Sequence, residues 1–363
     1  IHWSKRNLGL VTFRGSTQNN IVSIEPASEP YARPMDFISV LYDVQDPDPS
    51  RRYKMAYIVE DNVRKIASTA TAVSPDGLRW TLVNKEPFTR GHFENTSLIR
   101  FHGTYYAAGQ NLGTFGGHLY DGTEAGRTMK VFFSPDFRHW SGGRALAFHR
   151  DGYVPKPEGY GQEAHMGAGL WNRGNVVLGL YGRWYGDTIT GKRNRLDGLK
   201  IDLGLVISND AIHYREPQPD FVFLQRGAPG EWDSIALLQA NAFYNTDRET
   251  YIWYSHWDTG APWPIPALPE TVSNIKPSAI GLATLPRDRF GYVDKKFTEQ
   301  PARGTRGPAL PKDGLLLTRQ IVLQRSAQLY ANVDGVNADA RLRIDLVNDA
   351  EETLPGYSAE MNA

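Results

Sequence analysis

The sequence predicts an all-β fold built from repeated four-stranded units, and three observations carry this prediction. The stretch "SPDGLRW" at 74–80 recurs as "SPDFRHW" at 134–140 and, more loosely, as "SNDAIHY" at 208–214. The chain is rich in aromatic residues, with 9 Trp, 18 Tyr and 15 Phe, while 35 Gly and 23 Pro supply many turns. Apolar residues at the period of an amphipathic helix are scarce. Repeats at this spacing indicate one supersecondary unit that recurs along the chain.

Each repeated stretch places turn residues directly after an apolar strand. In such turns Asp accepts backbone N–H groups and Gly adopts a positive φ, which predicts a hairpin between the third and fourth strands of a unit. The expected second strands are aromatic: "RRYKMAYIV", "GTYYAAGQ", "NVVLGLYGRW" and "ETYIWYSHW". The expected innermost strands precede them: "DFISVLYD", "ENTSLIRFHG", "EAHMGAGLWN" and "DSIALLQANAFYN".

Four units are visible, and the N-terminal "IHWSKRNLG" is similar to the end of a fifth. A radial array of four-stranded sheets is a β-propeller. We therefore predict a five-bladed β-propeller over residues 1–311, with the inner strands of its first blade lying before Ile1. From about Lys312 the blade pattern is lost, and residues 312–363 are predicted to be the start of a β-sandwich that is cut short.

The charge balance excludes some classes of partner. Lys plus Arg and Asp plus Glu both number 40, so the formal net charge is zero and the basic excess of a nucleic-acid binder is missing. No apolar run approaches the roughly 20 residues of a membrane span. The chain has no Cys and hence no thiol nucleophile. We expect no nucleic-acid or membrane partner, and the sequence assigns no oligomeric state.

The blade pattern resembles that of the five-bladed propeller glycoside hydrolases, the invertase/levansucrase and arabinanase/xylosidase groups. Four stretches are most similar to bacterial glycosyl-hydrolase-like proteins with a C-terminal β-sandwich: "IHWSKRNLGLVTFRGSTQNNIV", "DPDPSRRYKMAY", "GEWDSIALL" and "SAIGLATLPRDRFGYVD". The resemblance covers nearly the whole chain. It implies a funnel on the propeller axis, with three carboxylates at the starts of inner strands. The invertase motifs "NDPNG", "RDP" and "EC" are absent, so residues are carried over by their position in the blade.

An acid begins the expected inner strand in all four visible blades: Asp36, Glu94, Glu163 and Asp233. Glycoside hydrolysis needs one carboxylic acid to protonate the leaving oxygen and one carboxylate as base or nucleophile. We predict these four residues as catalytic candidates. Glu163 lies among small and apolar residues, and burial there favours the protonated carboxyl that a general acid requires. The alternative for each acid is a structural role, as a loop cap or an Asx turn.

Several residues near the same strand ends are predicted to bind the sugar: His92, Asn95, His165, Arg183, Trp184, His256 and Trp257. The alternative for each is packing in the core or a structural hydrogen bond. No H-E-x-x-H or comparable spacing is present, so no metal site or cofactor is predicted, although a structural calcium ion is compatible with the fold. The acidic "DPDPS" from Asp46 is predicted to be a solvated hairpin loop.

The predicted function is a glycoside hydrolase that cleaves a glycan or oligosaccharide by carboxylate acid/base catalysis in the funnel. Its expected location is extracellular or periplasmic. Two alternatives stay open. A polysaccharide lyase acting on a uronate-containing glycan would use His165 with Arg183, and a non-catalytic carbohydrate-binding propeller would hold a sugar without cleaving it. A hydrolase leaves a new reducing end, a lyase leaves an unsaturated sugar, and a binding protein leaves neither.

Overall fold

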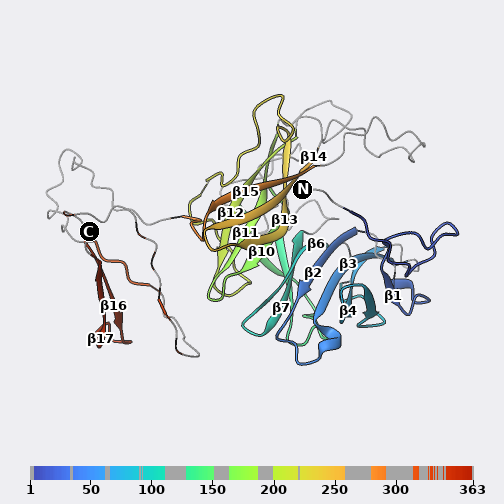
Figure 1. Cartoon of the computed structure of the whole chain (residues 1–363), viewed down its shortest axis with the longest axis horizontal. Helices are drawn as coiled ribbons and strands as arrows, with labels where there is room; N and C mark the ends of the chain where they lie inside the picture. Colours follow the sequence, from blue (N-terminus) through green and yellow to red (C-terminus); the bar gives the residue numbers. More distant parts are fainter. Residues whose placement is uncertain are drawn as a thin grey trace. The chain divides into compact units, whose positions relative to one another are not determined.

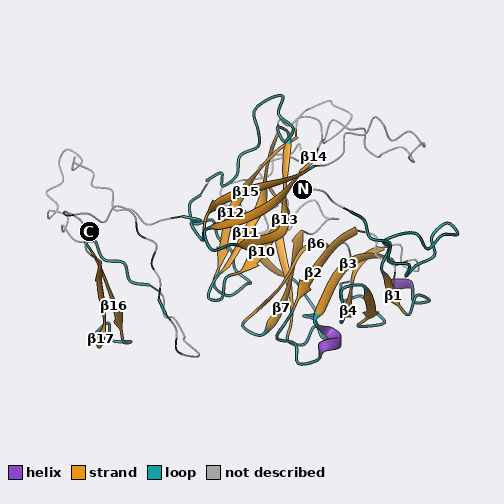
Figure 2. Cartoon of the chain, in the orientation of Figure 1, coloured by secondary structure: helices purple, strands orange, loops and turns teal. Residues whose placement is uncertain are grey.

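The structure, a computed structural model, is built from β-strands, which confirms the all-β prediction (Figures 1 and 2). It describes residues 4–32, 36–61, 66–89, 91, 93–110, 128–150, 163–186, 199–219, 221–257, 279–291, 314–318, 326, 328–329, 331, 333, 338 and 341–361. Within these ranges the helical elements are two short 3-10 turns, η1 (Pro30–Ala32) and η2 (Pro49–Arg51). No helix in the described part is long and apolar enough to cross a membrane.

The first two predicted units form separate sheets. The first sheet comprises β1 (Ser23–Glu25), β2 (Asp36–Tyr42), β3 (Tyr53–Asp61), β4 (Ile66–Ser74) and β5 (Arg79–Leu82), in the order β1-β5-β4-β3-β2. Its strands are antiparallel except β1, which runs parallel to β5 and adds an outer strand to the unit. The second sheet comprises β6 (Glu94–Phe101), β7 (Thr104–Gln110), β8 (Met129–Ser134) and β9 (Ala145–Phe148), paired antiparallel in sequence order.

The third and fourth predicted units form one six-stranded sheet, which differs from the expected separate blades. This sheet comprises β10 (Glu163–Asn172), β11 (Val177–Gly186), β12 (Leu199–Ser208), β13 (Ala236–Asn245), β14 (Glu249–Trp257) and β15 (Ile280–Pro286). The junction is a parallel pairing of β12 with β13 at Ile201 and Ala236. Among the described residues no strand pairs β2 with the other end of the array, so the closed five-bladed ring stays a prediction.

The inner strands β2, β6, β10 and β13 lie next to one another in the first compact unit (Figure 1). Three hydrogen bonds between β6 and β10 join Thr96 to Ala168, Ser97 to Leu170, and Arg100 to Asn172. These contacts advance along both strands together, so β6 and β10 run in the same direction. Strands β2 and β6 also run in the same direction, since Ser39 contacts Asn95 and the later Asp43 contacts Arg100. Strands β10 and β13 do so too, since His165 contacts Gln239 and Gly169 lies against Ala240.

All four inner strands therefore begin at one end of the unit, at Asp36, Glu94, Glu163 and Ala236. This end is called the mouth below. Gly169 shows why small residues recur on these strands, because a Cβ there would lie 2.3 Å from the Ala240 carbonyl oxygen. The backbones of β10 and β13 can approach this closely only without that side chain.

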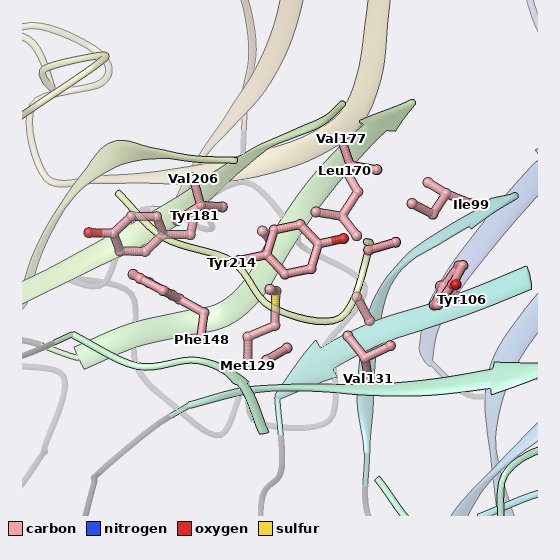
Figure 3. Packing of buried hydrophobic residues seen from close by; sticks show 14 of the residues in the cluster. Ile99, Tyr106, Met129, Val131, Phe148, Leu170, Val177, Tyr181, Val206 and Tyr214 are labelled. Atoms are coloured by element: carbon pink, nitrogen blue, oxygen red, sulfur yellow. The ribbon is translucent and has the colours of Figure 1, made fainter. Parts of the chain in front are cut away.

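Part of the core lies between neighbouring sheets, and other buried clusters lie within the first sheet and within the six-stranded sheet. One cluster joins residues of the second sheet to β10–β12 (Figure 3). The backbone N–H of Tyr214 donates to the Ala147 carbonyl at 2.9 Å and so ties the third repeated stretch to β9. The Tyr214 ring is buried in this cluster beside Met129 and Val206. The aromatic residue that ends the third repeated stretch thus packs between two sheets.

The repeated Ser-x-Asp turn has the same hydrogen bonds in all three copies. The Asp Oδ1 accepts the backbone N–H groups two and three residues later, at 2.8–2.9 Å. The Ser hydroxyl accepts the N–H of the Asp. In the first copy, the N–H groups of Arg79 and Leu78 lower the pKa of Asp76 to about 2. The repeat is therefore a self-contained turn that closes the hairpin after the third strand.

The loop "DPDPS" is not simply solvated, because Asp46 is buried. The fully buried Lys54 places its Nζ 2.6 Å from Asp46 Oδ2 and 3.8 Å from Asp43 Oδ2. Asp43 also accepts from Arg100 of β6 at 3.1 Å and from the Tyr105 hydroxyl at 2.6 Å. This charge network joins the first and second sheets at the end opposite the mouth.

Replacing Lys54 by Met should lower the free energy of unfolding by about 3–5 kcal/mol at neutral pH, because it removes the buried cation closest to the buried Asp46 carboxylate. Burial opposes ionisation of Asp46, but hydrogen bonds from Lys54 and the Asp48 backbone, with the charges of Lys54 and Arg51, lower its pKa overall. This stabilisation is present above the ordinary Asp value of about 4 and is lost as the pH falls through the lower folded value.

Urea denaturation of Lys54→Met and the parent at pH 7 and pH 3 measures this difference. Lys85→Met, at an exposed lysine, is the matched control and should change stability by less than about 0.5 kcal/mol. A loss for Lys54→Met as small as that of the control, or one that grows towards pH 3, contradicts the assignment.

The second compact unit spans Lys295–Ala363 and follows the first, Ile1–Asp294. Its described strands are β16 (Leu342–Val347) and β17 (Thr353–Met361), an antiparallel pair. The predicted boundary between 311 and 312 falls in a range outside the described residues, 292–313, and stays a prediction. The β-sandwich also stays a prediction.

Candidate active site

A break in strand pairing recurs close to the mouth on every inner strand. The register shifts fall between Asp36 and Ser39, Asn95 and Ser97, His165 and Ala168, and Gln239 and Phe243. A β-bulge bends its strand and re-aims the side chains beside it, and bulges are over-represented next to active sites. Each of the four inner strands therefore has an irregularity near the mouth that can orient the side chains there.

Glu94, the first residue of β6, is buried with 7% of its surface exposed. Its Oε2 accepts a hydrogen bond of 2.7 Å from Nε2 of Gln110, which lies directly opposite on β7. The other amide atom of Gln110, Oε1, accepts the backbone N–H of Met166 at 2.7 Å. Because a backbone N–H can only donate, it fixes the amide orientation, and Nε2 must face Glu94. The Glu94 carboxylate thus receives a hydrogen bond from the Gln110 amide, whose orientation is fixed.

The bulge in β10 stands beside Glu94 and has an unusual backbone. Met166 and Gly167 both have positive φ, 59° and 72°. A Cβ on Gly167 would lie 3.0 Å from the Gly109 Cα, so the bulge is pressed against β7. On its other side, Nε2 of Gln239 donates to the carbonyls of His165 and Gly167, both at 2.9 Å. Side-chain amides from two neighbouring strands therefore hold this bulge.

His165 lies at the start of the bulge and is 3% exposed. Its ring centroid is 5.0 Å from that of Trp184 and 6.1 Å from that of Trp257. Trp184 is 1% exposed and packs with Ile201 and Ala236, so it supports His165 from the core and does not face solvent as a sugar-stacking wall. Trp257 is half-buried at the end of β14.

Arg183 and Asn95 are also buried at this end of their strands, with 6% and 1% exposure. Arg183 of β11 lies opposite Asp202 of β12 in the strand register. Asn95 Nδ2 contacts the Ala56 carbonyl of β3 at 3.4 Å, so Asn95 links the first two sheets. Both positions fit a supporting role behind the mouth more closely than direct contact with a sugar.

Asp233 was expected to begin an inner strand, but β13 begins three residues later, at Ala236. The carboxylate accepts a hydrogen bond of 2.9 Å from the hydroxyl of Tyr254. Burial, that hydrogen bond and the Asp233 charge raise the pKa of Tyr254 to about 12, so the hydroxyl stays protonated at neutral pH. Trp232, 49% exposed, stacks on Tyr254 at 5.9 Å between centroids and lies 5.9 Å from the buried His256.

The remaining predicted residues contribute less to the described geometry. Asp36 begins β2 as expected, but it is exposed, and its Oδ1 accepts the N–H of the next residue, Phe37, at 2.8 Å. Glu163 begins β10, and its backbone pairs with Trp184. The side chain of Glu163 and the whole of His92 lie outside the described residues.

Three residues with evident roles at the mouth are absent from the sequence prediction: Gln110, Gln239 and Trp232. Gln110 and Gln239 each form hydrogen bonds with a strand of another unit, β10. No local pattern in the sequence indicates such contacts. Trp232 carries a visible signal in the sequence, since it directly precedes the candidate carboxylate Asp233.

Two further observations concern metal binding and a cavity outside the mouth. In the described ranges no group of three or more His, Asp or Glu side chains could hold a metal ion. A cavity of about 440 Å³ lies between the N-terminal segment and the first sheet, and apolar residues such as Val22, Met55 and Trp80 line it. Its lining contains no ionisable side chain, so we assign the candidate site to the mouth.

No protein-family model matches the chain, and no curated protein matches it. Among solved structures, the chain is similar to a glycoside hydrolase, with 11% identity, a TM-score of 0.42, and 74% of this chain and 72% of that chain covered. It is similar to a β-1,2-mannobiose phosphorylase from Listeria innocua solved with β-1,2-mannobiose, with 15% identity and a TM-score of 0.33. That match covers 52% of this chain and 45% of the phosphorylase. It is also similar to a sucrose-6-phosphate hydrolase from Lactobacillus gasseri, with 10% identity, a TM-score of 0.36, and 60% of this chain and 40% of that chain covered. The chain spans less than half of the length of the last two proteins, and the likeness concerns the fold.

Proposed function

We propose that this protein is a glycoside hydrolase whose catalytic carboxylates lie at the mouth. The observation that carries the proposal is Glu94, a buried carboxylate at the start of an inner strand, held by an amide that donates to it. Glu163 begins the adjacent inner strand at the same end. Glycosidic bond cleavage requires two carboxyl groups that flank the scissile bond, and two neighbouring strands that begin with Glu at one end could supply them.

We assign different roles to the two acids, starting from the described contact of Glu94. Glu94 accepts a hydrogen bond without needing a proton, which suits a base or nucleophile. Glu163 is the proposed general acid, which gives its proton to the leaving oxygen as the glycosidic C–O bond breaks. In an inverting reaction Glu94 takes a proton from the water that attacks the anomeric carbon. In a retaining reaction Glu94 bonds to that carbon, and water releases the sugar.

The observations support the lyase alternative less well. In its candidate pair, His165 and Arg183, the arginine lies opposite an acidic residue of the next strand, Asp202, instead of facing only a substrate. A tyrosine base at the mouth would have to lose its proton, but the pKa of Tyr254 is raised to about 12.

A panel of glycans and oligosaccharides tests the proposal, with and without inorganic phosphate in the buffer. A hydrolase releases new reducing ends at the same rate in both buffers. Sugar phosphate formed only with phosphate would identify a phosphorylase, and an ultraviolet-absorbing unsaturated product would identify a lyase. Binding without any product would identify a carbohydrate-binding protein. Each of the last three outcomes overturns the proposal.

Replacing Trp232 by Ala should raise KM by roughly 2- to 12-fold with kcat nearly unchanged, since an aromatic stacking contact contributes about 0.5–1.5 kcal/mol. The exposed indole beside Asp233 is the platform that would carry a sugar ring. Steady-state kinetics on the best glycan of the panel measures the effect. Tyr244→Ala, at an exposed aromatic near the opposite end of β13, is the matched control. Equal effects of the two variants would exclude a platform at Trp232.

A further inference from the structure

We infer that Gln110 is a positioning residue that fixes the Glu94 carboxylate and couples it to the bulge of β10. The inference rests on the proposed function, in which Glu94 is the base or nucleophile. It begins from the complete burial of Gln110, a polar residue with 0% exposure at the end of β7. Burial of an amide is costly unless its groups are hydrogen-bonded, so its contacts are informative.

The Gln110 amide joins two neighbouring inner strands. One side donates to Glu94 of β6, and the other accepts the backbone N–H of Met166 in β10, each at 2.7 Å. The amide group is planar and rigid, so a displacement of the bulge is transmitted to the carboxylate. If the Gln110 amide turned over, its Nε2 would face the backbone N–H of Met166. Both groups are donors, so this hydrogen bond would be lost.

The bulge itself is held from both sides. Gln239 of β13 donates to the two carbonyls that flank Met166, while Gln110 accepts the N–H between them. A positive φ is a sparsely populated state for Met166, a non-glycine residue, and it persists when surrounding contacts hold it, while Gly167 adopts a positive φ readily. Since β10 begins at Glu163, the bulge at Met166 lies three residues after the proposed general acid on the same strand.

A matched pair of substitutions separates positioning from packing. Gln110→Glu keeps the size and the acceptor for Met166, and its carboxyl can donate to Glu94 only while protonated. Gln110→Met keeps the approximate volume but removes both hydrogen bonds. The titratable residues near the mouth on strands packed against β7 are Glu94 of β6, Lys130 of β8, and Glu163 and His165 of β10.

The expected result is a change in the pH profile of kcat/KM. Relative to the parent, Gln110→Glu should be close to full activity at low pH and lose activity as its introduced carboxyl ionises. That ionisation should occur above the ordinary Glu value of about 4.3, because a second negative charge beside Glu94 is unfavourable. Gln110→Met should lose roughly 10²-fold at every pH, as expected for a misplaced catalytic group. Gln45→Glu and Gln45→Met, at an exposed glutamine far from the mouth, should leave the profile unchanged.

A carbon-13 NMR titration of Glu-labelled protein supplies a readout that does not need activity. In Gln110→Glu the introduced carboxyl and Glu94 should titrate as a coupled pair, with the Glu94 signal identified by its loss in Glu94→Gln. Independent titration of the two groups overturns the inference, as does a Gln110→Glu activity ratio that stays constant with pH in an active enzyme. Coupled titration in a protein that cleaves no glycan would instead refute the proposed function and leave the Gln110–Glu94 contact established.

Discussion

Replacing Glu94 by Gln is expected to lower kcat by roughly 10²–10⁴-fold. The substitution keeps the size of the side chain and still offers an oxygen to Gln110 Nε2, so the local structure should persist. It removes the negative charge that attacks the anomeric carbon or accepts the proton of water. Substrate affinity should be largely kept, because the loss concerns the transition state.

Stopped assays of sugar release, together with calorimetric binding of the same glycan, separate kcat from affinity. Glu249→Gln is the matched control, since Glu249 is an exposed acid that begins β14 at the end away from the mouth. Its kcat should equal that of the parent. If Glu94→Gln retains more than about a tenth of the parent kcat, Glu94 is not the base or nucleophile.

Replacing Glu163 by Gln is expected to lower turnover on natural glycans by a similar factor, roughly 10²–10⁴-fold. The loss should shrink on aryl glycosides, because a good leaving group needs less protonation. The Glu94→Gln loss should be comparable on both substrate types. This difference between the two variants, measured with one glycan and one aryl glycoside of the same sugar, assigns acid and base.

Two outcomes would contradict the assignment of Glu163. Parent-like activity of Glu163→Gln on natural glycans would exclude it as the acid. Equal losses on both substrate types would point to a binding or nucleophilic role, and the acid would have to be sought among the other mouth carboxyls, such as Asp233.

Local patterns in the sequence predicted much of the backbone. The Ser-x-Asp turns depend on neighbours within three residues, and all three occur where the repeat placed them. Asp36, Glu94 and Glu163 each begin the strand they were expected to begin. Asp233 does not, because the stretch before β13 folds into a turn in which the Ser234 N–H donates to the Glu231 carbonyl.

Contacts between residues on different strands and sheets were the part that no local pattern could supply. Lys54 looked like one charged residue in an apolar strand, but its partners Asp46 and Asp43 lie across a hairpin and turn a supposedly solvated loop into a buried ion network. Gln110 likewise ends an ordinary strand in the sequence. Its role appears only when β6, β7 and β10 are placed side by side.

Isotope labelling of the product tests the central claim most directly. The protein is incubated with the glycan that it processes best, in water enriched in oxygen-18 and with inorganic phosphate present, and the products are analysed by mass spectrometry. The account predicts one labelled oxygen at the new reducing end, formed by the parent and strongly reduced in Glu94→Gln and Glu163→Gln. Unlabelled sugar phosphate, an unsaturated product, or labelled product formed equally by all three proteins would contradict it.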